Sequence, residues 1–103
     1  MSITIEQADS VIKSLNQNNP EWFSAHEFIG RYIKMYEYNY IDMLVEYKNK
    51  HTLEIFKTVH NQIANFLSAN QNKLGISLNG QVTDMNVHHL ETPCSKWDMK
   101  PAE

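Results

Sequence analysis

The hydrophobic pattern of the chain changes its period within one stretch, TVHNQIANFLSANQNKLGISLNGQV, at residues 58–82. Apolar residues first recur every three or four positions, which is typical of a helix, and then alternate, which is typical of a strand. Asn79-Gly80 ends the alternation, and this dipeptide favours the tight turn of a β-hairpin. The stretch therefore predicts a helix that leads into a hairpin, and with it an α+β fold. The helical set is Val59, Ile63, Phe66 and Leu67, and the alternating set is Leu74, Ile76 and Leu78.

The bulk composition predicts a single soluble domain. The chain has 103 residues, of which 42% are hydrophobic, and we expect one domain over 1–103 with a core of its own. The one cysteine, Cys94, cannot form an internal disulfide, which favours a reducing, cytoplasmic compartment. No apolar run approaches the length of a membrane span, and residues 1–10 lack the pattern of a signal peptide.

Two capping boxes predict where the first helices begin. Thr4 and Gln7 form a T-x-x-Q box, and Ser24 and Glu27 form an S-x-x-E box. Apolar residues follow each box at helical spacing. The boxes predict helices over 5–16 and from 25 onward, with a short extended piece at 21–23 between them.

Two more helices are predicted before the hairpin. A helical pattern continues past residue 35, and we expect a break near 36–39 and a separate helix from Tyr40 to about Lys48. Thr52 is expected to cap the next helix, from about Leu53 to Ser68. The predicted buried stripe of this last helix is Phe56, Val59, Ile63, Phe66 and Leu67.

The hairpin is predicted to turn at Asn79-Gly80. A two-residue turn would place Leu78 opposite Gln81, which mixes apolar and polar residues. A type I turn with a bulge at Gly80 places Ile76 opposite Val82, and we favour this form because one buried face fixes the register. Residues 95–99 alternate enough to predict a further short strand that brings Trp97 onto the core.

This order of elements resembles the winged helix-turn-helix family. Its pattern is a helix, a short strand, a second helix, a recognition helix and a two-stranded wing, and it matches residues 4 to about 87. Here EWF would be the short strand, SAHEFIGRY the start of the second helix, Leu53 to Ser68 the recognition helix and LGISLNGQV the wing. The segment 37–48 departs from the family as an extra helix. The resemblance implies a mainly helical α+β domain and sequence-selective DNA binding in a small bacterial or phage regulator.

The outer face of the predicted recognition helix carries residue types that can read DNA. Asn and Gln can bond adenine edges, whereas Thr and Lys can reach phosphates. Lysines before and after this helix would contact the DNA backbone. An ordinary solvated face of an Asn-rich protein fits the same pattern, and both interpretations stay open. The predicted nucleic-acid-binding residues are Lys48, Lys50, Lys57, Thr58, Asn61, Gln62, Asn65 and Lys73.

The net charge of the chain argues against DNA binding, whereas the distribution of that charge favours it. The net charge is −3, whereas nucleic-acid-binding domains are usually basic. The charge is uneven, however: residues 1–47 hold three basic and seven acidic residues, and residues 48–78 hold four lysines and one glutamate. The basic segment contains the predicted recognition helix, so the asymmetry favours a polyanionic partner for this segment.

A tyrosine-rich segment supports a rival function. Five tyrosines fall within residues 32–47, and tyrosine is enriched in protein interfaces. The segment predicts either a homodimer or another protein partner, and the alternative function is a protein-interaction module that uses the scaffold without binding DNA. The predicted interface residues are Tyr32, Tyr36, Tyr40 and Tyr47.

Catalytic and metal chemistry are not indicated. His88, His89 and Cys94 lack the ligand number and spacing of a structural zinc site, and His60 lies close to the predicted buried stripe. No signature surrounds Cys94 that would make it a nucleophile. We therefore predict no enzyme activity, no cofactor and no metal.

Overall fold

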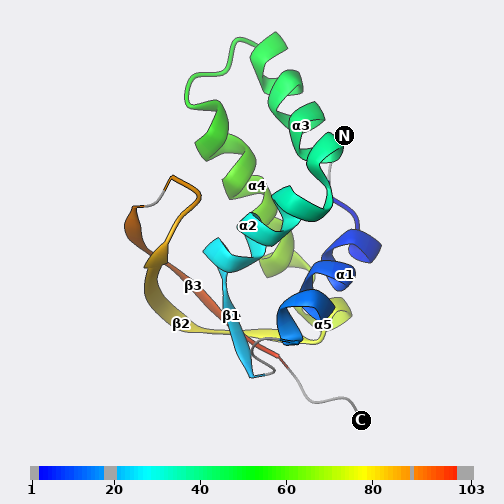
Figure 1. The fold of residues 1–103 in the computed structure, drawn as a ribbon, viewed down its shortest axis with the longest axis vertical. Coiled ribbons are helices and arrows are strands. Elements are labelled where there is room, and N and C mark those ends of the chain that lie inside the picture. Colours follow the sequence, from blue (N-terminus) through cyan, green and yellow to red (C-terminus); the bar gives the residue numbers. More distant parts are fainter. Residues whose placement is uncertain (1–2, 18–20, 89, 100–103) are drawn as a thin grey trace.

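The computed structural model describes residues 3–17, 21–88 and 90–99. This part of the chain forms an α+β fold with five helices and a three-stranded antiparallel sheet (Figure 1). No helix in it is long and apolar enough to cross a membrane. The elements are α1 (Ile5–Asn16), β1 (Trp22–Ser24), α2 (Ala25–Met35), α3 (Glu37–Asn49), α4 (Ile55–Ala69), α5 (Gln71–Leu74), β2 (Ile76–Met85) and β3 (Glu91–Met99).

Both predicted capping boxes are confirmed. The Thr4 hydroxyl accepts from the backbone N–H of Gln7, and the Gln7 side chain accepts from the backbone N–H of Thr4. Ser24 and Glu27 make the same reciprocal pair at 3.0 and 3.2 Å. These bonds satisfy backbone donors that the first turn of a helix leaves without partners, which fixes the starts of α1 and α2.

The helices between residues 35 and 69 differ in detail from the prediction. The break is confirmed at Tyr36, but α3 begins at Glu37. Thr52 does not cap α4: its backbone N–H bonds the Tyr47 carbonyl at 3.0 Å and completes the end of α3. Glu54 precedes α4 instead, with φ of 53° and no side-chain capping bond.

The predicted turn at Asn79-Gly80 is wrong. These residues form a bulge inside β2, since Leu78 pairs with Trp97 and Gln81 with Ser95. Gly80 adopts φ of 73°, which glycine tolerates at a bulge. The backbone conformations open to Asn-Gly, which favour a turn, here allow a bulge within a continuous ten-residue strand.

The chain reverses direction between β2 and β3 instead. The Asn86 side-chain oxygen accepts from the backbone N–H groups of His88 and Leu90 at 2.9 and 3.1 Å. The Asn86 backbone N–H also donates to the Leu90 carbonyl at 2.8 Å. We call β2, β3 and this turn the hairpin.

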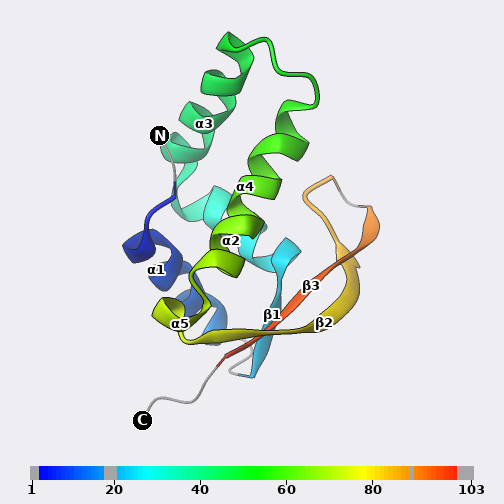
Figure 2. The same ribbon diagram turned by 180° about the vertical axis from the view of Figure 1, so that it is seen from behind.

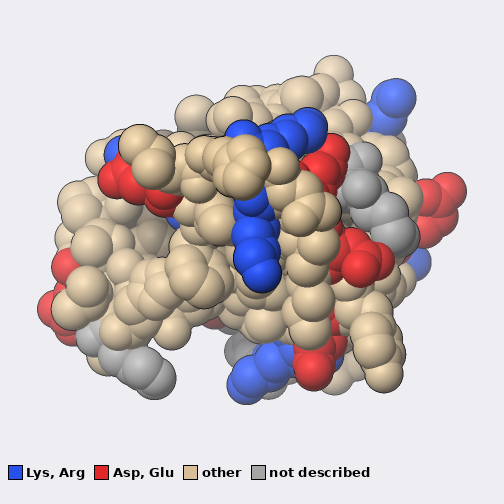
Figure 3. Space-filling view, turned by 90° about the horizontal axis from the view of Figure 1, so that it is seen from above, with Lys and Arg blue, Asp and Glu red and all other residues tan. Residues whose placement is uncertain are grey.

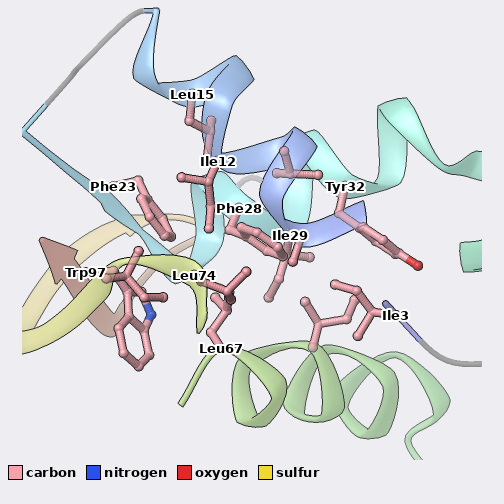
Figure 4. Packing of buried hydrophobic residues seen from close by; sticks show 14 of the residues in the cluster. Ile3, Ile12, Leu15, Phe23, Phe28, Ile29, Tyr32, Leu67, Leu74 and Trp97 are labelled. Carbon is pink, nitrogen blue, oxygen red and sulfur yellow. The ribbon is translucent and has the colours of Figure 1, made fainter. Parts of the chain in front are cut away.

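The core lies between the helices and the sheet. The strand order is β1-β3-β2, so the central strand β3 carries Trp97 onto the core, as predicted. Figure 4 shows Trp97 and Phe23 from the sheet beside Leu74 and facing Phe28 and Leu67 from the helices. Phe23, Phe28 and Leu67 are fully buried, and their burial against the strands holds helices and sheet together.

The arrangement in space places α4 between α3 and the hairpin. The helices α3 and α4 extend together from the body of the molecule, and the turn of the hairpin bends toward α4 (Figure 1). The view from behind shows α4 in front, with the hairpin at its side (Figure 2). One long flank of α4 therefore faces the hairpin.

Candidate nucleic-acid interface

A cleft of about 390 Å³ lies between α4 and the hairpin, with α2 at its base. Its wall on α4 includes Lys57, His60 and Asn61, which follow each other at helical spacing. None of the described residues that line it is Asp or Glu, although the whole chain carries a net charge of −3. The polar lining consists of His26, Lys57, His60, Asn61, Gln81, Asn86, His88, Cys94 and Ser95.

Hydrogen bonds to Asp84 hold the hairpin against the start of α2. The fully buried Ser24 donates its hydroxyl to the Asp84 carboxylate at 2.5 Å. His26 Nδ1 lies 3.1 Å from the Asp84 carbonyl oxygen, and since that oxygen can only accept, Nδ1 donates. His26 Nε2 lies 3.4 Å from the Thr92 hydroxyl. These bonds set the position of the hairpin and thereby the width of the cleft.

His60 and His88, which line the cleft, belong to a cluster of aromatic rings. The rings of His60 and His88 lie 6.2 Å apart, and Phe56 contacts His88 edge to face at 5.4 Å. On its other side His60 shares a 2.7 Å hydrogen bond, Nε2 to the Tyr40 hydroxyl. The cluster thus joins α3, α4 and the turn of the hairpin.

Burial lowers the pKa of His60 to about 4, and the neighbouring His88 and His26 contribute to the same shift. A histidine with a depressed pKa takes up its proton at a higher pH in the unfolded chain than in the folded one. The stability that the neutral ring contributes is therefore lost as the pH falls from about 6.5 toward 4.

We expect His60→Gln to flatten the acid limb of the stability profile. A glutamine side chain does not titrate, so the variant should lose less free energy of unfolding between pH 7 and pH 4.5 than the natural chain. The difference is expected to be on the order of 1–2 kcal/mol, once the partial exposure of the ring is discounted. Urea unfolding at a series of pH values measures it. His51→Gln, at an exposed position, is the control, and equal pH slopes for the two variants would contradict the depressed pKa.

The predicted DNA-reading residues on α4 separate into two groups. Lys57 and Asn61 line the cleft, and Asn65 is exposed one turn further along the same face. Thr58 instead donates its hydroxyl to the Glu54 carbonyl at 3.1 Å, and Gln62 donates its amide to the Tyr47 hydroxyl of α3. The structure therefore groups Lys57, Asn61 and Asn65, and directs Thr58 and Gln62 elsewhere.

The predicted lysines do not form one patch. Lys50 lies 3.2 Å from Glu46, and Lys57 lies 3.8 Å from Glu54, so both are near carboxylates. Lys73 lies on α5, beyond the far end of α4, which is about 22 Å long. Lys48 is exposed near the end of α3. Figure 3 views the end of the molecule where α3 and α4 meet, and there blue and red atoms lie interspersed.

The predicted tyrosine interface is corrected by burial. Tyr32 is 0% exposed and Tyr40 is 7% exposed, because both pack into the core. Tyr36 and Tyr47 are half-buried and also contact that core. The prediction for Phe56 is wrong in the opposite direction. Its helical spacing predicts that it is buried in the apolar stripe of α4, but it is 50% exposed.

Several residues of the cleft could not be found from local sequence patterns. His26, Gln81 and Ser95 come from three separate elements, and no local pattern joins them; only the register of the hairpin brings them together. The described residues hold no group of His, Cys, Asp or Glu arranged to bind a metal ion. His89, which neighbours His88 in the sequence, lies outside the described residues.

Searches of known proteins give no relative for this chain: no family model, no curated protein and no solved structure matches it.

Proposed function

We propose that this chain is a winged-helix domain that binds double-stranded DNA sequence-selectively, in the manner of a small transcriptional regulator. In this proposal α4 is the recognition helix in the major groove, and the hairpin is the wing beside it. The order of α1, β1, α2 and α4 before the hairpin supports the proposal, as does the position of β3 between β1 and β2. The extra helix α3 lies on the flank of α4 away from the cleft, where Gln62 contacts Tyr47.

The observation that carries the proposal is the lining of the cleft. Although the chain is acidic, the described residues that line the space between α4 and the hairpin include hydrogen-bond donors and no carboxylate. A DNA phosphate needs such donors and is repelled by carboxylates. Lys57 supplies a positive charge, while Gln81 and Ser95 supply hydrogen-bond donors.

In this proposal the exposed asparagine side chains on α4 contact the bases. Asn61 and Asn65 are one turn apart on one face, and an asparagine can bond an adenine edge with both its amide atoms. Gln62 would have to leave the Tyr47 hydroxyl before it could contact a base. We therefore assign sequence selectivity to Asn61 and Asn65 in the first place.

A second candidate function is a protein-interaction module on the same scaffold. Tyr38, Ile41 and Val45 of α3 favour it, because these apolar side chains are exposed. A module of this kind would be insensitive to charge changes in the cleft.

The test of DNA binding compares two charge reversals of equal net effect. Lys57→Glu is expected to weaken binding of a labelled duplex at low salt by at least about tenfold, because it places a carboxylate in the cleft. Lys13→Glu is the matched control, since this exposed lysine lies on α1 and pairs with Asp9 at 2.9 Å. Fluorescence anisotropy gives both dissociation constants. Equal weakening by the two variants would mean that binding follows net charge alone, which contradicts the role of the cleft.

A further inference from the structure

The helix α3 has two apolar faces, and the fold covers only one of them. Its inner face holds Tyr40 and Met43, which are 7% and 1% exposed. Opposite them, Tyr38, Ile41 and Val45 are 86%, 45% and 45% exposed. Their spacing of three and four residues places them in one line along the helix. We call these three residues the outer face of α3.

Apolar residues on two opposite sides are typical of a helix that is buried on both sides. A solvent-facing helix would carry charged residues in that line, and these three large side chains instead remain in water. Scattered apolar residues are ordinary on a surface, but a continuous line along one helix marks a contact site.

The charged residues beside the outer face indicate which partner would fit it. Glu37 and Lys48 are eleven residues apart, about three turns, and therefore lie on the same flank of α3. A second α3 packed antiparallel would bring its own Lys48 next to Glu37 and its Glu37 next to Lys48. In a parallel pair about a twofold axis these two flanks would lie on opposite edges of the contact, and no such ion pair would form. The charge order is thus complementary to an inverted copy of the same helix.

We propose that two copies of this chain associate through their outer faces, with the two α3 helices antiparallel about a twofold axis. The axis passes at the level of Asp42, so that Tyr38 of each copy packs near Val45 of the other and Glu37 lies near the level of the other copy's Lys48. A twofold contact of this kind uses the same residues twice, and two Glu37–Lys48 pairs form at its ends. The proposal does not depend on DNA binding, because the outer face and the cleft lie on different flanks of the α3–α4 pair.

The contact is expected to be weak. One helix pair covers less than the roughly 1,200 Å² at which stable interfaces begin. Asp42 weakens the contact further. It lies on the other flank of α3 near the axis, where the Asp42 carboxylates of the two copies would approach and repel each other. Association should therefore appear only at high protein concentration, and Asp42→Asn should strengthen it.

Sedimentation velocity over about 5–500 µM protein, without DNA, tests the proposal. The natural chain is expected to shift from monomer to dimer across this range, and Ile41→Asp should remain monomeric. Leu53→Asp is the matched control, since Leu53 is 87% exposed but lies in the α3–α4 loop, and it should dimerise like the natural chain.

Charge swapping distinguishes self-association from a general loss of folding. Glu37→Lys and Lys48→Glu should each weaken dimerisation about tenfold, because each creates two like-charge pairs across the axis. The double variant restores opposite charges and should recover dimerisation to within about twofold of the natural chain. Circular dichroism confirms that each variant is folded. A natural chain that stays monomeric at the highest concentration, or a double variant no better than the single ones, would overturn the proposal.

Discussion

Phe23→Ala is expected to lower the free energy of unfolding by about 3–5 kcal/mol, the usual cost of truncating a buried phenylalanine. Phe23 is 0% exposed, pairs with Trp97 across the sheet and lies 5.9 Å from the Phe28 ring, centroid to centroid. It is the middle residue of β1, which has only three residues. Truncation would therefore open a cavity where helices and sheet meet. A loss of this size is a large part of the stability of a domain this small.

Phe56→Ala is the matched control for this prediction. The same atoms are removed, but Phe56 is 50% exposed, so the loss should be near 1 kcal/mol, less than half that of Phe23→Ala. Urea unfolding followed by circular dichroism gives both values. Similar losses for the two variants would show that Phe56 belongs to the core, as the helical spacing alone indicates, and would contradict the described packing of α4.

Ser24→Ala is expected to cost about 2–3 kcal/mol, an unusual amount for the loss of one oxygen atom. The Ser24 hydroxyl has two functions: it caps α2 by accepting from the Glu27 N–H, and it donates to the Asp84 carboxylate at 2.5 Å. Without it Asp84 Oδ2 loses this donor at a part-buried site, although Oδ1 still accepts from the Met85 N–H at 2.8 Å, and β2 loses a bond to the start of α2. Ser10→Ala, at an exposed position on α1, is the control and should change stability by less than about 0.5 kcal/mol.

A double-mutant cycle with Asp84→Ala separates the two functions of Ser24. The cap is lost in either background, whereas the bond to Asp84 exists only in the natural one. We expect a coupling energy of at least about 1 kcal/mol between the two positions. Strictly additive losses would show that Ser24 acts as a helix cap alone and does not hold the hairpin in place.

Local signals were reliable where one physical cause decided the structure. The boxes at Thr4 and Ser24 predicted both helix starts, because the side chain and the backbone groups it satisfies lie three residues apart. The break between α2 and α3 and the strand that carries Trp97 were also visible as changes of pattern.

The sequence was misleading where distant contacts decided between two local solutions. Asn79-Gly80 suits a turn and a bulge equally well, and the pairing of Leu78 with Trp97 selects the bulge. Tyr32 and Phe56 both lie at apolar helical positions, yet packing buries the first and leaves the second half in water. The residues that line the cleft are far apart in the sequence, and the register of the hairpin brings them together. Local sequence patterns therefore could not predict the lining.

The most direct test of DNA binding is the salt dependence of duplex affinity for the natural chain. Anisotropy of a labelled mixed-sequence duplex is measured from about 20 to 200 mM salt, where displaced counterions make the logarithm of affinity fall linearly with the logarithm of salt concentration. The proposal predicts a slope that corresponds to about two to four phosphate contacts, which requires Lys48 or Lys50, at the end of α3, to contact the duplex together with Lys57. No binding at the lowest salt would contradict the assignment of α4 and the hairpin as a DNA-binding surface.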